Sequence, residues 1–523
     1  MTKEAERAEL HKAIWRVANE LRGQVDGWDF KAYVLGILFY RFLSENLTEH
    51  INREERHSNP DFDYRRLPSA EAELGRAVTV HEKGFFVLPE DLFQNVRENA
   101  EHDANLNVTV KRALDNIAAS AMGTASERDF KGLFDDLDVN SSRLGSTVED
   151  KNKRLRRLLN AIGDLNLGHN GNTIDAFGDA YEYLMTMYAS SAGKSGGEFY
   201  TPQEVSELLA RITVALPDGT QKKQVNKVYD PACGSGSLLL KYDSVLGHGN
   251  VRQGYFGQEV NPTTFNLCRI NMFLHNIPYE KFDIALGDTL VNPAHGEDEP
   301  FEAIVSNPPY SIQWEGDSNA TLIDDPRFSQ AGVLAPKSKA DLAFTMHMLS
   351  WLAEDGVAAI VEFPGVLYRG GAEAKIRKYL IDNNFVEAVI QLPPDLFFGT
   401  TIATCIIVLK KAKTDNKVLF IDATKLVQRE GNKNKLRKTH QDAVLKAYTD
   451  RVDVAHFAAL VDKSEIAASP TCNLSVTSYV KVEDTREAVD IIELNARISE
   501  VVARQTELRA NIDAIVANLE VGA

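Results

Sequence analysis

Cysteine is scarce in this 523-residue sequence, which has only four: Cys233, Cys268, Cys405 and Cys472. They lie far apart without paired metal-ligand spacing, which argues against a zinc site and against a secreted disulfide framework. No apolar run approaches the roughly 18 residues needed to span a bilayer, and the charged segment 1–10 lacks the apolar core of a signal peptide. The sequence therefore predicts a cytoplasmic protein with no metal centre and no membrane partner.

An excess of positive charge is also missing, because the formal net charge is −17 at pH 7. A protein that grips DNA by itself usually has a basic balance, since neutralised phosphates supply much of the affinity. Here the average charge repels DNA. Either a local basic surface overrides that average or a partner contributes much of the DNA contact, and the net charge alone does not choose between them.

What is present is the composition of an ordinary globular protein, 44% hydrophobic and 25% charged, in a chain too long for one core. We expect a helical domain over 1–165, in which the segment 28–46 is apolar almost all round, as a buried helix should be. The basic amphipathic segment 151–162 is more simply explained by a solvated helix face than by a phosphate contact.

Between 166 and 475, helical patterns alternate with short β-rich runs, which indicates an α/β, Rossmann-like domain with a mostly parallel sheet covered on both faces. The segment 476–523 returns to helix. Its apolar residues form a heptad seam from Ile491 to Leu519 with one polar position, Gln505. A helix that folds onto its own domain and a helix that meets another subunit explain this seam equally well. The expected strands are 225–229, 254–258, 303–305, 357–362, 385–391 and 404–410.

A glycine-rich loop follows the first expected strand, with the sequence DPACGSGS from Asp230 to Ser237. Its glycines let the backbone approach a ligand closely, and Ser237 opens a helix whose first amides are free. The Gly-Lys-Ser/Thr of a phosphate loop does not follow. The predicted ligand contacts in this loop are Gly234, Ser235, Gly236 and Ser237.

Acidic residues end three successive strands: Asp230, Glu259 and Asp288. At the end of a second strand Glu259 can hold both ribose hydroxyls of a nucleoside, and Asp288 is placed near an adenine ring. Any one of them could be a solvated loop carboxylate, but the combination favours S-adenosyl-L-methionine. That cofactor presents an adenosine, a sulfonium that attracts acids, and no phosphate.

The tetrapeptide Asn307, Pro308, Pro309 and Tyr310 follows the strand 303–305. The prolines stiffen the backbone, so the Asn307 side-chain oxygen and the Pro308 carbonyl can accept both hydrogens of a planar amine. The amine nitrogen is then drawn toward tetrahedral geometry, and its lone pair faces the methyl group, while Tyr310 stacks on the base. A base in such a pocket must leave the double helix. These four residues are the predicted catalytic site, although a mere turn is the alternative.

These motifs resemble the amino-methyltransferases and, more specifically, the modification subunits of type I restriction-modification systems. The resemblance covers nearly the whole chain, from LHKAIWRVANELRG at 10–23 through DAFGDAYEYLM at 175–185 and GGEFYTPQEV at 196–205 to LFFGTTIATCIIVLKK at 396–411. It implies that the Glu-Phe-Tyr-Thr-Pro segment covers the methionine end of the cofactor. The contacts carried over on that basis are Glu198, Phe199, Tyr200, Thr201, Pro202 and Gln203.

The resemblance further implies methylation of the N6 amine of adenine in double-stranded DNA. It implies two modification subunits per specificity subunit, which reads the DNA sequence, and a separate restriction subunit. Neither the stretch from Tyr310 to residue 357 nor the stretch from Lys411 to the terminal helix has room for a recognition domain of about 100 residues. A partner subunit that reads the DNA site agrees with this lack of room and with the acidic net charge. The terminal helix is a reasonable docking surface for that partner.

Several alternatives stay open at the level of the sequence. A self-contained adenine methyltransferase would read its own site, and protein glutamine methyltransferases carry the same tetrapeptide in much shorter chains. Cytosine amine methylation usually has serine in place of Asn307, and nothing supports a scaffold without turnover. The most basic stretch, from Lys425 to His440, is explained equally well by a phosphate contact and by a solvated loop.

Overall fold

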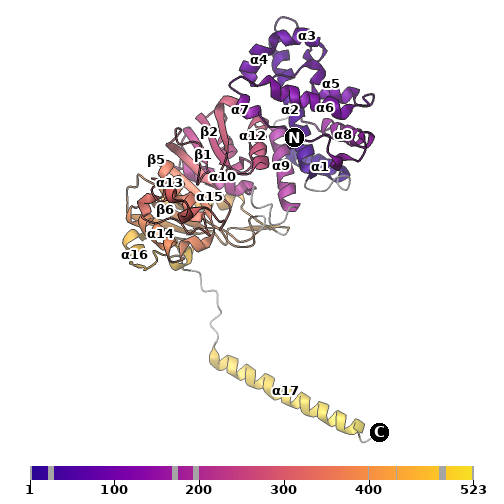
Figure 1. The fold of residues 1–523 in the computed structure, drawn as a ribbon. Coiled ribbons are helices and arrows are strands. Elements are labelled where there is room, and N and C mark those ends of the chain that lie inside the picture. The colour runs from indigo at the N-terminus through magenta and orange to yellow at the C-terminus, as the bar shows by residue number, and fades with distance from the viewer. Residues whose placement is uncertain are drawn as a thin grey trace. The chain divides into compact units, whose positions relative to one another are not determined.

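The computed structural model describes residues 3–21, 29–167, 175–191, 200–397, 400–431, 433–481 and 490–520. The chain divides into two compact units, Met1–Val480 and Lys481–Ala523 (Figure 1). In the described ranges no helix is both long enough and apolar enough to cross a membrane.

The N-terminal part of the first unit consists of helices and short turns. Helix α2 (Asp29–Glu55) is its centre, because every residue from Tyr33 to Ser44 is buried, as the all-round apolar pattern predicts. Arg41 in this run is buried but satisfied: it pairs with Glu45 at 2.6 Å and donates to the carbonyl of Ile162 at 2.5 Å. The other helices are α1 (Lys3–Leu21), α3 (Ser69–Ala72), α4 (Arg76–Lys83), α5 (Phe93–Asn99), α6 (Leu106–Ser120), α7 (Glu127–Phe130) and α8 (Val148–Gly163).

Helix α8 contains the basic amphipathic segment identified from the sequence. Thr147 caps its N-terminus by accepting a hydrogen bond from the Asp150 backbone N–H at 3.1 Å. Its apolar face, which includes Leu155 and Leu159, is buried in the helical core, so its basic residues lie toward the other side.

A nine-stranded sheet follows in the order β11-β8-β6-β7-β5-β4-β1-β2-β3. The pairs β1–β2, β2–β3, β1–β4, β4–β5 and β6–β8 are parallel, whereas β7 runs antiparallel between β5 and β6, and β11 is antiparallel to β8. The mostly parallel sheet predicted from the sequence is therefore confirmed. The strands are β1 (Val225–Asp230), β2 (Val251–Glu259), β3 (Phe282–Leu286), β4 (Phe301–Ser306), β5 (Leu352–Glu362), β6 (Val386–Gln391), β7 (Cys405–Lys410), β8 (Lys417–Asp422) and β11 (Ala458–Asp462).

Alternate strand residues enter two hydrophobic cores, one on each face of the sheet. In β5, Val357 and Ala359 belong to one core, and Ala358 and Ile360 belong to the other. The first core is covered by α10 (Gln203–Val214), α11 (Ser237–Leu246), α12 (Pro262–Leu274) and α15 (Lys438–Asp450) and is continuous with the core of the N-terminal helices. The second is covered by α13 (Asp341–Trp351), α14 (Ala372–Asp382) and α16 (Lys463–Ala468). Helix α9 (Ala176–Ser191) also joins the first core.

The basic stretch between Lys425 and His440 contains a small antiparallel hairpin, β9 (Gln428–Glu430) and β10 (Lys433–Lys435). The sequence pattern did not indicate these strands, because they are polar throughout and have no buried face to impose alternation.

The second unit contains one uninterrupted helix, α17 (Ile491–Glu520) (Figure 1). It spans the predicted heptad seam. The apolar seam residues whose side chains are described are between 44% and 72% exposed. Monomeric proteins seldom leave so long an apolar row in water.

Candidate active site

The predicted site residues meet at one edge of the sheet, where β1 lies between β2 and β4. All three strands are parallel, so Asp230, Glu259 and Ser306 end neighbouring strands on the same side. The chain order reverses at β1, and ligands of doubly wound sheets bind outside the carboxyl ends of the strands at such a switch point.

Asp230 joins the glycine loop to the predicted catalytic turn, residues 307–310. Its Oδ1 accepts hydrogen bonds from the Ala232 backbone N–H at 3.0 Å and from the Ser306 hydroxyl at 2.9 Å. The side chain is fully buried, and its Oδ2 has no hydrogen-bond partner among the described residues. Burial raises the pKa of Asp230 to about 7. The two motifs are therefore held together by one carboxyl group in a dry environment.

The glycine loop has the backbone that its sequence requires. Gly234 and Gly236 have positive φ angles of 55° and 78°, and a Cβ on Gly236 would lie 2.8 Å from the sulfur of Cys268. The Gly234 N–H donates to Glu259 Oε2 at 3.0 Å, and the Asn261 N–H donates to Glu259 Oε1 at 2.8 Å. Glu259 thereby fixes the loop, and each of its oxygens has a further lone pair. Burial also raises the pKa of Glu259.

The remaining loop residues are anchored by neighbouring helices and loops. The Ser235 carbonyl accepts a hydrogen bond from the Asn271 side chain at 2.9 Å, and the Ser237 hydroxyl lies 3.3 Å from Gln203 Nε2. Asp288 is exposed just after β3, and its Oδ1 accepts the Leu290 N–H at 2.9 Å. All three acidic residues thus lie at the same sheet edge, with Asp230 buried and Asp288 open to solvent.

The catalytic turn is a hydrogen-bonded unit. The Asn307 amide nitrogen donates to the Thr201 hydroxyl oxygen at 3.0 Å, and the Tyr310 hydroxyl donates to Asn307 Oδ1 at 2.6 Å. Pro308 is buried and Pro309 half-buried. One lone pair of the Asn307 oxygen is therefore used by Tyr310, and the other remains for a substrate N–H.

The segment before α10 reaches the same edge from another side. The Tyr200 hydroxyl lies 2.6 Å from the Thr186 hydroxyl of α9, and Pro202 is the residue before α10. Glu198 and Phe199, which were predicted to contact the cofactor, lie outside the described residues.

The structure gives three residues near this site contacts that the sequence did not predict: Thr201, Ser306 and Phe397. Thr201 was expected to contact the cofactor, yet in the structure its hydroxyl holds the side chain of Asn307. Ser306 bridges to Asp230, and the Phe397 ring packs edge-on against Tyr310 with centroids 6.4 Å apart. Of the three, only Phe397 could have been anticipated, because it lies in the 396–411 motif. Thr201 and Ser306 are small polar residues in segments that were already explained in another way.

A cavity of about 810 Å³ lies beside this edge. It shares Tyr200, Pro202 and Gln203 with the predicted cofactor contacts, and α1, α9 and the β9–β10 hairpin also line it. Asp230, Glu259, Asp288 and Asn307 do not line it. The predicted acidic contacts and the predicted catalytic turn therefore lie at the strand ends and not in this cavity.

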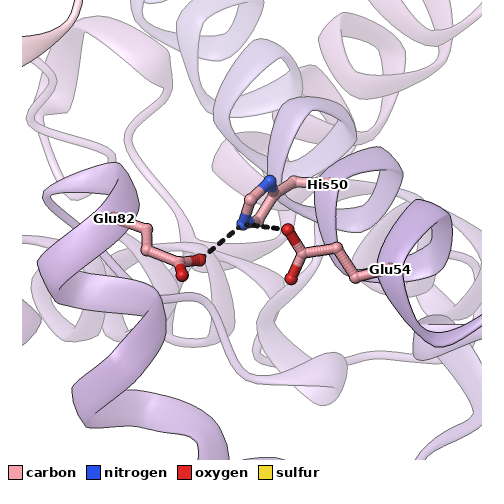
Figure 2. A group of neighbouring side chains, drawn as sticks. All are labelled: His50, Glu54 and Glu82. Carbon is pink, nitrogen blue, oxygen red and sulfur yellow. Dashed lines mark hydrogen bonds and ion pairs between the residues drawn. The ribbon is translucent and has the colours of Figure 1, made fainter.

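A separate group of potential ligand side chains lies in the N-terminal helices, where His50 and Glu54 of α2 face Glu82 of α4 (Figure 2). His50 Nε2 is 2.9 Å from Glu82 Oε2 and 3.8 Å from Glu54 Oε1. One imidazole nitrogen directed at two carboxylates is an ion-pair geometry that ties α2 to α4. The expectation of no metal centre stays a prediction.

The chain matches two family models, one after the other along the sequence: the HsdM N-terminal domain over residues 10–162 and N-6 DNA Methylase over residues 172–488. It is 47% identical to the type I restriction enzyme MpnII methylase subunit of Mycoplasma pneumoniae, over 98% of this chain and 96% of that protein. It is 29% identical to the MjaVII methylase subunit of Methanocaldococcus jannaschii, over 72% of this chain and 64% of that protein.

Solved structures agree with these matches. The type I restriction-modification methyltransferase subunit from Streptococcus thermophilus is similar with a TM-score of 0.82 at 34% identity, over 91% of this chain and 99% of that chain. A modification subunit of a type I restriction enzyme from Vibrio vulnificus shares the fold, with a TM-score of 0.58 at 19% identity over 87% of this chain and 93% of that chain.

The doubly wound sheet with these neighbours is that of an S-adenosylmethionine-dependent methyltransferase. Within that class the chain belongs to the methylase subunits of type I restriction enzymes, whose second domain is an N-6 DNA methylase.

Proposed function

We propose that this chain transfers a methyl group from S-adenosyl-L-methionine to the N6 amine of adenine in double-stranded DNA, as the modification subunit of a type I restriction-modification complex. The observation that carries the proposal is the Asn307 turn. It is held between Thr201 and Tyr310 at the end of β4, one strand away from the glycine loop and its acidic residues.

The residues present fit an adenosyl cofactor. The half-buried Glu259 keeps lone pairs for two hydroxyl groups. No Gly-Lys-Ser/Thr prepares the loop for phosphate. When bound, S-adenosylmethionine supplies an electrophilic methyl group. The residues that would hold it are Glu198, Phe199, Tyr200, Thr201, Pro202, Gln203, Asp230, Gly234, Ser235, Gly236, Ser237, Glu259 and Asp288.

The catalytic turn prepares the adenine amine for attack. The free lone pair of Asn307 Oδ1 and the Pro308 carbonyl accept the two N6 hydrogens, and the nitrogen lone pair is then no longer shared with the ring. Tyr310 offers an aromatic surface on which the flipped base stacks, and the buried Phe397 ring packs edge-on against Tyr310. As the N6–carbon bond forms, the bond between that carbon and the cofactor's sulfur would break and leave a neutral thioether, and the nitrogen would gain a positive charge and release one proton to water. The rate depends mainly on positioning.

Partner subunits would supply recognition of the DNA site and restriction. A specificity subunit shared by two modification subunits would read the DNA site, and a restriction subunit would join the complex. The exposed seam of α17 is a surface on which helices of the specificity subunit can pack. A partner that carries part of the DNA contact also agrees with the net charge of −17. We expect the complex in the cytoplasm, where its DNA is.

The proposal is tested by purifying the chain alone and together with its neighbouring gene products, and then supplying labelled cofactor and DNA. We expect labelled N6-methyladenine only with the specificity subunit present, and its loss in the Asn307→Ala variant. Asn383→Ala is the matched control, because Asn383 is exposed before the amino end of β6, away from the catalytic edge.

Other outcomes of the same experiment identify the alternatives. Methylation of DNA by the chain alone indicates a self-contained methyltransferase. Label in protein rather than in DNA indicates glutamine methylation, and full activity of Asn307→Ala contradicts the proposed role of the turn.

A further inference from the structure

Two buried carboxyl groups lie beside the catalytic turn and take no part in the chemistry described above. Glu362 is the last residue of β5, which is parallel to β4, and so it ends at the same sheet edge as Ser306. Asp341 is the first residue of α13. Both side chains are almost completely inaccessible to solvent, with exposures of 0% and 1%. Carboxyl groups are seldom buried without a purpose, because desolvation is costly.

Asp341 is hydrogen-bonded to the residue that follows the catalytic turn. Its Oδ1 accepts the backbone N–H of Ser311, the residue after Tyr310, at 3.0 Å. Ser311 has a φ angle of 53°, a left-handed conformation that residues other than glycine adopt at a cost. One residue further on, the Ile312 carbonyl accepts the Ala340 N–H at 3.0 Å. The start of α13 and the turn are therefore joined by two hydrogen bonds, one of which compensates a strained residue.

Glu362 is the second member of the pair. Its Oε1 accepts the Thr345 hydroxyl at 2.9 Å, and Thr345 lies on α13 like Asp341. The other oxygens, Glu362 Oε2 and Asp341 Oδ2, are both buried without a hydrogen-bond partner in the described part of the chain. Among its charged neighbours Asp341 affects Glu362 most. Two carboxyl groups in one dry site cannot both be ionised without a large penalty.

The groups around Glu362 do not neutralise it. Glu373 of α14 is a third acid, and its own cation, Arg369, lies 3.4 Å from it. The Tyr310 hydroxyl and the Cys405 thiol complete the surroundings, and burial raises the pKa of both. Burial and the charge of Asp341 raise the pKa of Glu362 well above its usual range. The protonated form of Glu362 is therefore favoured more strongly than in an exposed glutamate.

We propose that Asp341 and Glu362 are positioning residues for the methyl transfer: Asp341 clamps the catalytic turn through the Ser311 N–H, and Glu362 ties α13, which carries Asp341, to the end of β5 through Thr345. This inference rests on the proposed function, because the turn is assigned there. Neither carboxyl group touches the substrate. Their effect reaches the adenine amine through the backbone of 307–311, so loss of the clamp displaces the acceptors and leaves cofactor binding intact.

The test uses the assembled complex and compares Asp341→Ala, Asp341→Asn and Glu362→Gln with the wild type. We expect Asp341→Ala to lower kcat about tenfold or more, with the KM for S-adenosylmethionine unchanged, because small displacements of reacting groups reduce rates strongly. Asp341→Asn keeps an oxygen that accepts the Ser311 N–H, so it should recover most of the activity. Asp355→Ala, at an exposed position near the amino end of β5, is the control.

Glu362→Gln tests the second half of the proposal through pH. Burial and Asp341 raise the pKa of Glu362, so raising the pH of the wild type through that pKa ionises a buried carboxyl group, and kcat should decline there. Glutamine cannot ionise, so kcat of the variant should match the wild type below that pKa and keep its value as the pH rises. An identical alkaline decline in both proteins would overturn the role of Glu362.

Two further results decide the remaining cases. Wild-type kcat in Asp341→Ala would overturn the clamp. If that variant does not fold, as a thermal melt would reveal, the pH profiles of Glu362→Gln and Asp341→Asn still test the pair. Failure of the wild-type complex to methylate adenine contradicts the proposed function instead, so the two failures are distinguishable.

Discussion

The side-chain nitrogen of Asn307 lies 3.0 Å from the Thr201 hydroxyl oxygen and donates a hydrogen bond to it. The two residues are 106 positions apart in the sequence, and the bond orients the amide so that its oxygen faces Tyr310. The segment before α10 therefore positions the asparagine that is predicted to be catalytic.

Replacing Thr201 by valine removes the acceptor and keeps the shape of the side chain. We expect kcat of the complex to fall about fivefold, because one hydrogen bond of this kind is worth about 1 kcal/mol. Steady-state methylation with labelled cofactor measures the effect. Thr201→Ser should restore kcat, and a valine variant with wild-type kcat would show that the bond does not matter.

The stability of the chain should depend on pH through Asp230. A carboxyl whose pKa is raised in the folded state destabilises the fold progressively as the pH rises from its unfolded pKa of about 3.9 to its folded pKa of about 7. Asp230→Asn cannot ionise and escapes this loss. The melting temperature of the variant minus that of the wild type should therefore increase between about pH 5 and about pH 8.

Differential scanning fluorimetry across that range measures the difference directly. Asp218→Asn is the control, because Asp218 is exposed and should give a nearly flat difference. A flat difference for Asp230→Asn as well would mean that Asp230 does not titrate in this window.

Assembly should depend on the seam of α17. Replacing Ile498 and Leu508 by serine removes apolar surface that is 51% and 55% exposed in the chain alone. We expect loss of co-purification with the specificity subunit and an unchanged melting temperature for the isolated chain, because residues 481–523 form a separate compact unit. Glu500→Ala with Glu507→Ala, which lie off the seam on the same helix, should assemble normally. An intact complex on gel filtration for the serine variant would refute the docking role.

The cations of the β9–β10 region should differ in their effect on DNA binding. Lys433 donates hydrogen bonds to the Phe397 carbonyl at 2.7 Å and to the Thr400 carbonyl at 3.4 Å. Phe397 is the residue whose ring packs against Tyr310. Lys433→Gln should therefore lower kcat and leave the salt dependence of DNA binding unchanged.

The cations at 435, 437 and 438 have side chains between 43% and 61% exposed. If they contact phosphates, neutralising Lys435, Arg437 and Lys438 together should reduce the slope of log affinity against log salt by about 0.9 for each contact. Fluorescence anisotropy of the complex over a salt series measures both variants. An unchanged slope in the triple variant would show that these three cations do not contact phosphates, and the region would then be explained as a solvated loop.

The central strands were predictable because each is an apolar run next to turn residues, whereas the outer elements were not. Strand β8, which like β1 has six residues, was not predicted, and β9 and β10 have no buried side from which alternation could arise. The seam of α17 was also plain in the sequence, but the choice between an internal face and a docking face needed the exposure of its side chains.

At the site, the sequence alone determined which chemistry is proposed, because a glycine loop without phosphate signals, acids at strand ends, and a stiff turn with amide and carbonyl oxygens are local patterns. Only the tertiary structure decided which groups hold that chemistry in place. Thr201 beside Asn307, Asp230 beside Ser306, and Asp341 beside Ser311 are each at least 30 residues apart in the chain. Contacts over such distances are created by strand order and helix packing, and no local pattern records them.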